Sequence, residues 1–147
     1  MRVIALDLAT RSGWAVADPG GVTASGVVGL SDRPRGEAAI QRHARMGDVL
    51  ALVLADLLDE HRPDVACVET AAGAMKGEAA RVLFGLRMVA GVVLWRRELL
   101  IDEAPASQWQ PWARAHADWT KGDEEDARGI ALWWQAVRMP LVREVRA

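Results

Sequence analysis

Val3-Ile4-Ala5-Leu6-Asp7-Leu8 opens the chain with a short apolar run that contains β-branched residues and an acid near its end. Such a run predicts a buried central strand. Residues 9–13 predict a turn, and Trp14-Ala15-Val16-Ala17 predicts a second strand. After Asp18-Pro19-Gly20-Gly21, a strong turn signal, residues 22–30 predict a third strand. Three strands joined by tight turns predict an antiparallel meander.

Helical and strand patterns alternate after the meander. Apolar residues recur at helical spacing from about Glu37 to His61. Arg62-Pro63 stops that helix, and residues 64–69 predict a strand. A second apolar helix is predicted from Glu78 to Arg97, followed by a short strand at residues 99–101. Helices that separate strands favour parallel pairing of those strands.

The C-terminal third is less regular. Residues 102–122 predict a loop that contains at most one short helix, because Pro105 and Pro111 act as breakers. A last helix is predicted over about 123–137, and Pro140 ends it. We therefore expect an α/β fold. Its sheet is mixed and five-stranded, antiparallel in the first three strands and parallel after them, and helices flank it.

Length and composition describe an ordinary globular protein. At 147 residues, the chain is expected to form one domain that spans residues 1–147. No apolar run approaches the ~18 residues that a transmembrane helix needs, so we expect no membrane partner. The N-terminal apolar stretch is too short for a signal peptide. The single Cys67 cannot form an intramolecular disulfide, so a reducing, cytoplasmic setting is expected.

Four acidic residues recur at the ends of elements that could bring them together: Asp7, Glu69, Asp123 and Asp126. If the first and fourth strands pair in parallel, Asp7 and Glu69 emerge at the same edge. The spacing of Asp123 and Asp126 places both on one helix face. Converging carboxylates repel one another, and Mg²⁺ or Mn²⁺ relieves that repulsion. The pattern predicts a site for phosphodiester chemistry, in which two ions roughly 3.5–4 Å apart activate a water and stabilise the leaving oxygen.

Each acid also has a structural interpretation. Asp7 alone could cap a turn, and Asp123 could be an N-cap with Asp126 as a capping-box-like partner. Capping by Asp123 is compatible with metal binding. Glu69 has no obvious turn role. Glu124-Glu125 is interpreted as a solvated first-turn pair, either member of which could serve as a ligand if the register shifts by one.

Element order and acids together resemble the RNase H-like superfamily, and within it the RuvC-type Holliday-junction resolvases, especially small phage-like members. Residues 4–15 are similar to that family's strand-Asp-loop-Gly-aromatic pattern. Val68-Glu69-Thr70 matches a Glu after the fourth strand, and residues 123–127 match paired aspartates that open the last helix. The resemblance covers nearly the whole chain. It implies a metal-dependent endodeoxyribonuclease that binds two Mg²⁺ or Mn²⁺ ions and cuts branched DNA.

Three basic residues flank the acidic motifs and could contact DNA phosphates: Arg11, Lys76 and Lys121. Lys76 belongs to a loop predicted at Gly73–Gly77. A solvated surface role is the alternative for each. A second candidate basic patch consists of Arg33, Arg35, Arg42 and Arg45. The net charge of −2 argues against a uniformly basic DNA-binding surface but not against a local one.

Three of the tryptophans have two possible roles. Trp109, Trp112 and Trp119 could stack on unpaired bases, but we interpret them as packing their loop onto the domain.

The helix at 78–97 is unusually apolar for one that covers a single sheet face. Because a four-way junction has approximate two-fold symmetry, we expect a homodimer to which this helix contributes. The alternative is a fully buried helix in a monomer.

Other functions remain to be distinguished from junction resolution. An RNase H-like nuclease could instead cut an RNA–DNA hybrid or flap DNA. A non-catalytic or regulatory domain of the same fold is a second alternative, although all four acids are retained. The ASKHA phosphotransferases share an early Asp-containing hairpin. They need two such domains to enclose a nucleotide, whereas this chain has room for one.

Overall fold

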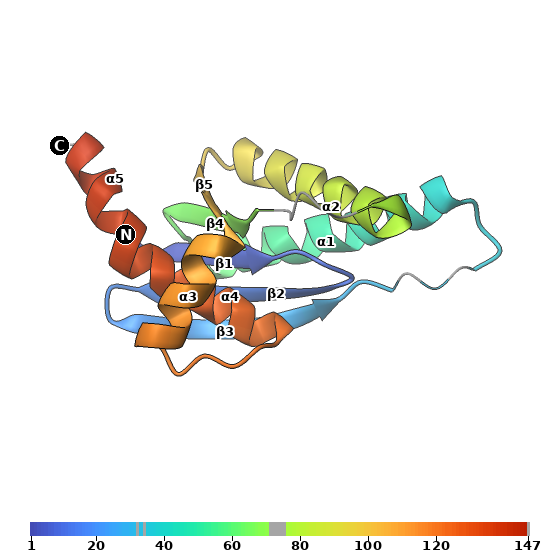
Figure 1. Ribbon diagram of the computed structural model, residues 1–147. Coiled ribbons are helices and arrows are strands. Elements are labelled where there is room, and N and C mark those ends of the chain that lie inside the picture. The colour runs from blue at the N-terminus through green and yellow to red at the C-terminus, as the bar shows by residue number, and fades with distance from the viewer. Residues whose placement is uncertain (32, 34, 71–75, 147) are drawn as a thin grey trace.

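A five-stranded mixed sheet forms the centre of the protein in the computed structural model, which describes residues 1–31, 33, 35–70 and 76–146 (Figure 1). The strand order is β3-β2-β1-β4-β5. The strands are β1 (Val3–Asp7), β2 (Arg11–Asp18), β3 (Gly21–Gly29), β4 (Val65–Glu69) and β5 (Leu100–Ala104). The first three are antiparallel, and β4 pairs in parallel with both β1 and β5. The predicted mixed sheet is confirmed.

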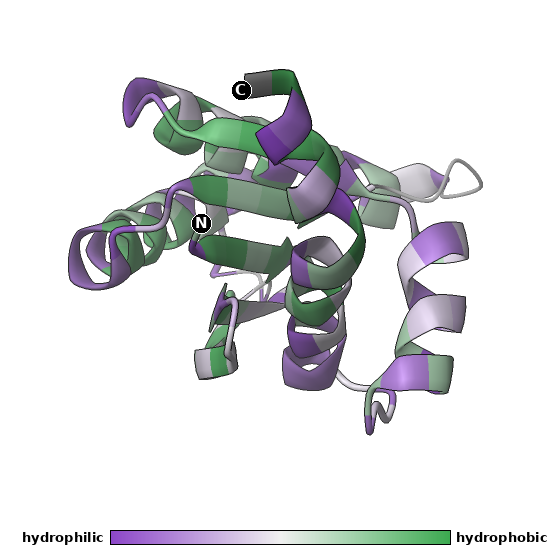
Figure 2. Cartoon of the chain, turned by 90° about the vertical axis from the view of Figure 1, so that its left-hand side faces the viewer, coloured by the Kyte–Doolittle hydropathy of each residue, from purple (hydrophilic) through white to green (hydrophobic). Residues whose placement is uncertain are grey.

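Helices cover both faces of the sheet. They are α1 (Ala39–His61), α2 (Gly77–Arg96), α3 (Ala106–His116), α4 (Asp123–Trp133), the π-helical turn η1 (Trp134–Arg138) and α5 (Met139–Arg146). Alternate residues of β1 point to opposite faces. Ile4 and Leu6 pack against α1 and α2, whereas Val3 and Ala5 pack against α3 and α4. The central strands are accordingly hydrophobic along most of their length (Figure 2).

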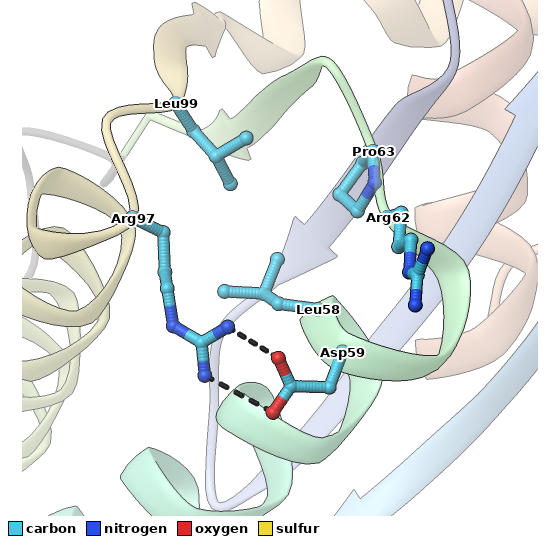
Figure 3. Close-up of a pocket in the computed structure, with 6 residues that line it drawn as sticks. All are labelled: Leu58, Asp59, Arg62, Pro63, Arg97 and Leu99. Carbon is cyan, nitrogen blue, oxygen red and sulfur yellow. Dashed lines mark hydrogen bonds and ion pairs between the residues drawn. The ribbon is translucent and has the colours of Figure 1, made fainter.

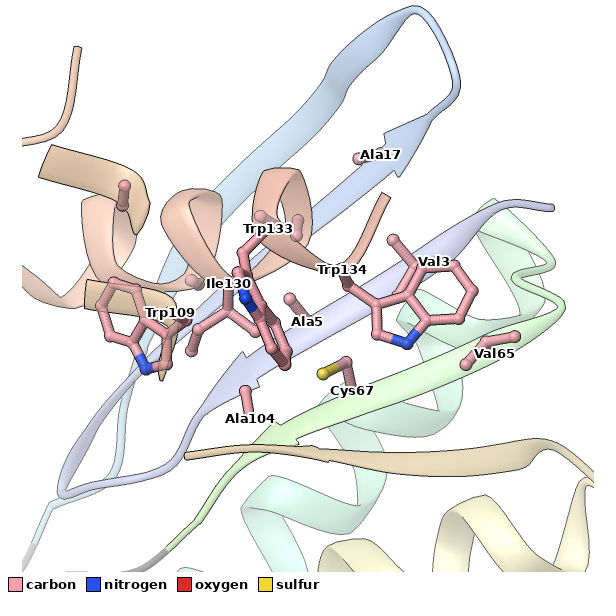
Figure 4. Close-up of a cluster of buried hydrophobic side chains, with 14 residues drawn as sticks. Val3, Ala5, Ala17, Val65, Cys67, Ala104, Trp109, Ile130, Trp133 and Trp134 are labelled. Carbon is pink, nitrogen blue, oxygen red and sulfur yellow. The ribbon is translucent and has the colours of Figure 1, made fainter. Parts of the chain in front are cut away.

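The core under α4 is built from large aromatic rings over small strand residues. Trp134 lies above Val3, Val65 and Cys67, and its side chain is fully buried (Figure 4). Small residues such as alanine and cysteine on the strands leave room for an indole to approach the sheet. This packing fixes the position of α4 on the sheet. Among the described residues, no helix has the length and apolarity that crossing a membrane would require.

Two predicted boundaries are wrong, both involving proline. The loop predicted at residues 102–122 is confined to residues 117–122: β5 continues to Ala104, and the short helix allowed there, α3, runs through Pro111. Proline removes one backbone donor from a helix, and burial of Trp109 and Ala113 on the same helix compensates for that loss. The last helix also continues past Pro140. A proline ring clashes with the carbonyl four residues earlier, and the wider turn of η1 directly precedes it.

Other predicted boundaries agree closely with those of the structure. The first long helix ends at His61, and Arg62 adopts a left-handed conformation (φ 46°) and donates its N–H to the Leu58 carbonyl. Part of the loop predicted at Gly73–Gly77 lies outside the described residues.

Candidate metal and DNA site

Asp7 and Glu69 lie next to each other at one edge of the sheet. In the parallel pairing of β1 with β4, Leu6 is opposite Val68. The next residues along the two strands are Asp7 and Glu69. The two strands end together, so both carboxylates emerge where the backbone leaves the sheet. The predicted adjacency of these two acids is therefore confirmed.

The N-terminus of α4 lies directly over β2 because Gly13 has no side chain. Gly13 is the antiparallel partner of Asp7. A Cβ atom added at Gly13 would lie 1.7 Å from the backbone oxygen of Asp123 and 2.4 Å from its carbonyl carbon. Only glycine permits this approach. Gly13 thus allows the first turn of α4, which carries Asp123 and Asp126, to reach the end of β1.

The pKa of Asp7 is raised by the other three acids, which shows that all four lie close together. Burial, repulsion from Glu69 and a hydrogen bond with Glu69 raise the pKa of Asp7 to about 8, and the charges of Asp126 and Asp123 add to the rise. Like charges within a few ångströms disfavour ionisation of each other. Burial also raises the pKa of Asp126, against opposing hydrogen bonds from Gly122 and Trp119. Without a cation, this cluster favours retention of a proton on Asp7.

Two tryptophans bind two of these carboxylates. Trp109 on α3 donates its indole N–H to Glu69 Oε1 at 3.0 Å, and Trp119 donates its own to Asp126 Oδ1 at 3.0 Å. The backbone N–H of Gly122 also faces Asp126 Oδ1, at 3.4 Å. The prediction that these tryptophans pack onto the domain is borne out by the full burial of Trp109. The sequence predicted neither hydrogen bond: Trp109 and Glu69 are 40 residues apart, and Trp119 lies 7 residues before Asp126 in a segment predicted to be a loop.

The other acids of the first turn of α4 are engaged elsewhere. Glu124 accepts a hydrogen bond from Ser25 on β3 at 2.6 Å. Glu125 pairs with Arg128 one turn along the helix, at 3.5 Å. Asp123 and Asp126 are the members of this turn whose charges act on Asp7. Glu124 and Glu125 therefore have partners of their own, outside the cluster around Asp7.

The three predicted DNA-binding residues have different surroundings. Arg11 donates to Asp123 Oδ2 at 3.0 Å and is largely exposed, so a cation already lies at the edge of the carboxylate cluster. Lys121 is exposed, and its charge lowers the pKa of Asp126. Lys76 is the N-cap residue of α2 and is exposed. Within the part of the chain that the structure describes, Lys76 makes no hydrogen bond or ion pair with the four acids.

Two residues of the second candidate basic patch, Arg42 and Arg45, are engaged within the protein, whereas Arg33 and Arg35 are exposed. Arg45 binds the carbonyls of Ser31 and Arg33 and pairs with Glu37 at 2.6 Å. Arg42 pairs with Glu78 on α2, also at 2.6 Å. Both guanidinium groups hold neighbouring segments together. These contacts give Arg42 and Arg45 a structural role in the position where the sequence suggested DNA contact.

The chemistry of the donor set fits a hard divalent cation. All four acids supply carboxylate oxygens, the ligands that Mg²⁺ and Mn²⁺ prefer, and a bound cation would remove the repulsion that raises the pKa of Asp7. Across residues 1–31, 33, 35–70 and 76–146, no three acidic, histidine or cysteine side chains already form a metal cage. Arg11 and the two indoles instead hold oxygens of three of the acids.

A separate hollow of about 400 Å³ lies at the other end of β4 and β5 (Figure 3). It is lined by Leu58, Asp59, Arg62, Pro63, Arg97 and Leu99. Arg97 forms an ion pair with Asp59 across it. One ion pair, the further arginine Arg62 and apolar side chains offer neither a metal-ligand set nor a nucleophile. The carboxylate cluster is therefore the candidate functional site.

Comparison with known proteins identifies the fold. No protein-family model and no curated protein sequence matches the chain. Solved structures do match. Thermus thermophilus RuvC in complex with a Holliday junction substrate superposes with a TM-score of 0.72 at 18% identity, covering 95% of this chain and 96% of that one. The yeast mitochondrial Holliday junction resolvase superposes at 0.64 with 13% identity, covering 97% and 83%. The fowlpox virus resolvase with junction DNA gives 0.53 at 10% identity, covering 95% and 99%. The chain has the fold of the RuvC-type Holliday-junction resolvases.

Proposed function

We propose that this protein is a metal-dependent, structure-selective endodeoxyribonuclease that resolves Holliday junctions and related branched DNA. The observation that carries the proposal is the convergence of Glu69, Asp123 and Asp126 on Asp7, at the strand ends of a fold shared with junction resolvases. Isolated acids with capping roles would not raise the pKa of one another. A shared cluster does so, and perturbed acids of this kind gather at functional sites.

Asp7, Glu69, Asp123 and Asp126 would hold two Mg²⁺ or Mn²⁺ ions. The bound ions would supply Lewis-acid activation of a water and charge stabilisation for phosphodiester hydrolysis. The chain's own residues position these groups. The parallel pairing of β1 with β4 fixes Asp7 against Glu69, and Gly13 admits Asp123. Arg11 is largely exposed and, among the described residues, its guanidinium pairs with Asp123 alone, so it can transfer its contact to a DNA phosphate.

Lys121 and Lys76 are proposed to contact the DNA backbone. Lys121 directly precedes the turn that carries Asp123, and its charge reaches Asp126. Lys76 begins α2, a few residues beyond Glu69. Positive groups beside an acidic site offset its repulsion of the polyanion. Lys121 has the stronger support, because its electrostatic contact with the site is part of the structure.

A homodimer through α2 is proposed to hold two such sites in fixed relation. The exposed apolar residues of α2 recur at helical spacing and form one stripe: Phe84, Met88, Val92 and Trp95. Met88 is 72% exposed and Trp95 74%. Large apolar side chains in a contiguous exposed stripe are typical of interaction surfaces. Paired nicks in a two-fold symmetric junction require two active sites related by the same symmetry.

The dimer is tested by light scattering at micromolar concentration. Met88→Glu should convert a dimer into a monomer, because the introduced charge would be buried at the interface. Val145→Glu on α5 is the matched control, since Val145 is 88% exposed and lies outside the stripe. A wild-type mass equal to that of one chain, with symmetric nicking intact, would contradict the dimer.

The enzymatic proposal is tested with a synthetic four-way junction, a linear duplex and an RNA–DNA hybrid, each with Mg²⁺ and with EDTA. We expect Mg²⁺-dependent cleavage of the junction alone. Asp7→Asn and Glu69→Gln should abolish cleavage yet retain junction binding, because less negative charge faces the DNA. Glu124→Gln is the control, since this acid lies in the same turn as Asp123 but binds Ser25. Preferred cleavage of the hybrid, or wild-type turnover by Asp7→Asn, would refute the assignment.

A further inference from the structure

Trp109 and Trp119 form a single unit beside the carboxylate cluster. Their rings meet edge to face, with centroids 5.6 Å apart and planes at 89°. This is a favoured arrangement for aromatic pairs. Each indole N–H donates to a different acid at 3.0 Å, Trp109 to Glu69 and Trp119 to Asp126. The two acids belong to different elements, β4 and α4, so the ring pair bridges them.

The surrounding residues hold this pair in place. A Cβ atom at Gly129 would lie 2.9 Å from the Trp109 ring and 3.1 Å from the Trp119 ring, so this glycine on α4 makes room for both. The Arg114 guanidinium lies over the Trp119 ring, 5.4 Å from its centroid. Trp109 is fully buried. Both rings therefore pack against α4 and against each other.

The chemistry of the indole donor suits a site that must keep its charge. An indole N–H is neutral and can only donate, so it orients a carboxylate without neutralising it, whereas a lysine or arginine would compete with a metal cation. Each indole binds one oxygen, Oε1 of Glu69 and Oδ1 of Asp126. The other oxygen of each carboxylate is not used by the tryptophan. Partners of this kind orient metal ligands in proteins.

We propose that Trp109 and Trp119 are coupled positioning residues, which set the separation and orientation of Glu69 and Asp126 for divalent-metal binding. The inference rests on the proposed metal site and goes beyond it, because it names the groups that arrange the ligands. The edge-to-face contact makes the two tryptophans interdependent. Loss of either one should release both carboxylates in part.

The test measures Mn²⁺ affinity of the DNA-free protein by titration calorimetry. Trp109→Phe, Trp119→Phe and the double variant each keep an aromatic ring but lose the donor. Trp134→Phe is a matched control, since Trp134 is equally buried and donates to Asp102 at 3.0 Å, outside the cluster. We expect each single variant to lower Mn²⁺ affinity by about 10- to 100-fold. The control should remain within about two-fold of wild type, because its carboxylate is not a ligand.

A second expectation concerns coupling. The double variant should lose less affinity than the product of the two single losses, because each substitution already disturbs the other ring. In junction cleavage, the Mn²⁺ concentration for half-maximal rate should rise, with the rate at saturating Mn²⁺ much less affected. Trp119 is only half buried, so Trp119→Phe provides the test even if Trp109→Phe does not fold.

The outcomes separate this inference from the proposed function. If wild type binds Mn²⁺ and the variants lose affinity but no junction is cut, the nuclease proposal fails and the role of the tryptophans stands. If wild type cuts junctions and both single variants bind Mn²⁺ like Trp134→Phe, the positioning role is wrong. A wild-type protein that binds no Mn²⁺ would overturn it as well.

Discussion

Replacement of Gly13 by alanine should disable the site from a position that carries no functional group. The new Cβ would lie 1.7 Å from the Asp123 carbonyl oxygen, whereas real contacts of this kind are not shorter than 3.0 Å. The first turn of α4 must therefore move by about 1.3 Å or β2 must bend away from it. The carboxylates of Asp123 and Asp126 move with that turn. Their separation from Asp7 and Glu69 then changes by more than a metal site tolerates.

The magnitude follows from the displacement. A misplacement of about 1 Å costs about 100-fold in rate, so we expect Gly13→Ala to lower the single-turnover rate of junction cleavage by at least ~100-fold. Overpacking a tight contact should also reduce the free energy of unfolding by about 1–3 kcal/mol. The assay uses a fluorescent four-way junction at saturating enzyme and Mg²⁺. Unfolding in urea is measured in parallel.

Gly29→Ala supplies the matched control. Gly29 lies on β3, and a Cβ atom there would meet nothing within 4 Å. The control should therefore cut at a rate close to wild type. Near-wild-type cleavage by Gly13→Ala, with a stably folded protein, would refute the argument that close approach of α4 assembles the site.

Three further predictions concern charge. In EDTA, the unfolding free energy of the wild type should decrease as pH rises from about 4 to about 8, because folded Asp7 binds its proton more tightly (pKa about 8) than the unfolded chain does. Asp7→Asn should lack this decrease. If urea titrations at several pH values showed that the unfolding free energies of wild type and Asp7→Asn change equally with pH, the prediction would be wrong. Lys76→Ala and Lys121→Ala should each lower the salt slope of junction binding by about one unit, measured by fluorescence anisotropy, without weakening Mn²⁺ binding, measured by calorimetry. Unchanged salt slopes would make them ordinary surface residues. Arg87 donates to the backbone carbonyl of Glu69, so Arg87→Ala should lower the free energy of unfolding by about 1–2 kcal/mol in a urea titration, and an unchanged midpoint would show that this contact contributes little.

Much of the sheet could be predicted from local patterns. The run at residues 3–8 and the turn at residues 18–21 predicted an antiparallel meander, and helical spacing predicted the parallel strands that follow. The position of Glu69 beside Asp7 follows from that topology alone. Such predictions succeed because periodicity and turn chemistry act over a few neighbouring residues.

The helices whose boundaries were wrongly predicted show the limit of prediction from neighbouring residues. Pro111 and Pro140 were both interpreted as breakers, yet burial of Trp109 stabilises one helix and the π-turn accommodates the other proline. Tertiary packing outweighed local propensity in both cases. The hydrogen bond between Trp109 and Glu69 spans 40 residues. No short-range pattern reveals such a contact, or the closeness of Gly13 to Asp123.

The placement of α4 on the sheet also bears on how the protein is made. Asp7 and Glu69 are synthesised early, whereas Asp123 and Asp126 arrive with α4, whose Ile130 and Trp133 pack on the second face of the sheet. A nascent chain that has not reached α4 lacks half of the carboxylates, and only α3 can cover that face of its sheet. Folding of the last layer and completion of the candidate site are therefore the same event. Incomplete chains should accordingly lack the proposed nuclease activity.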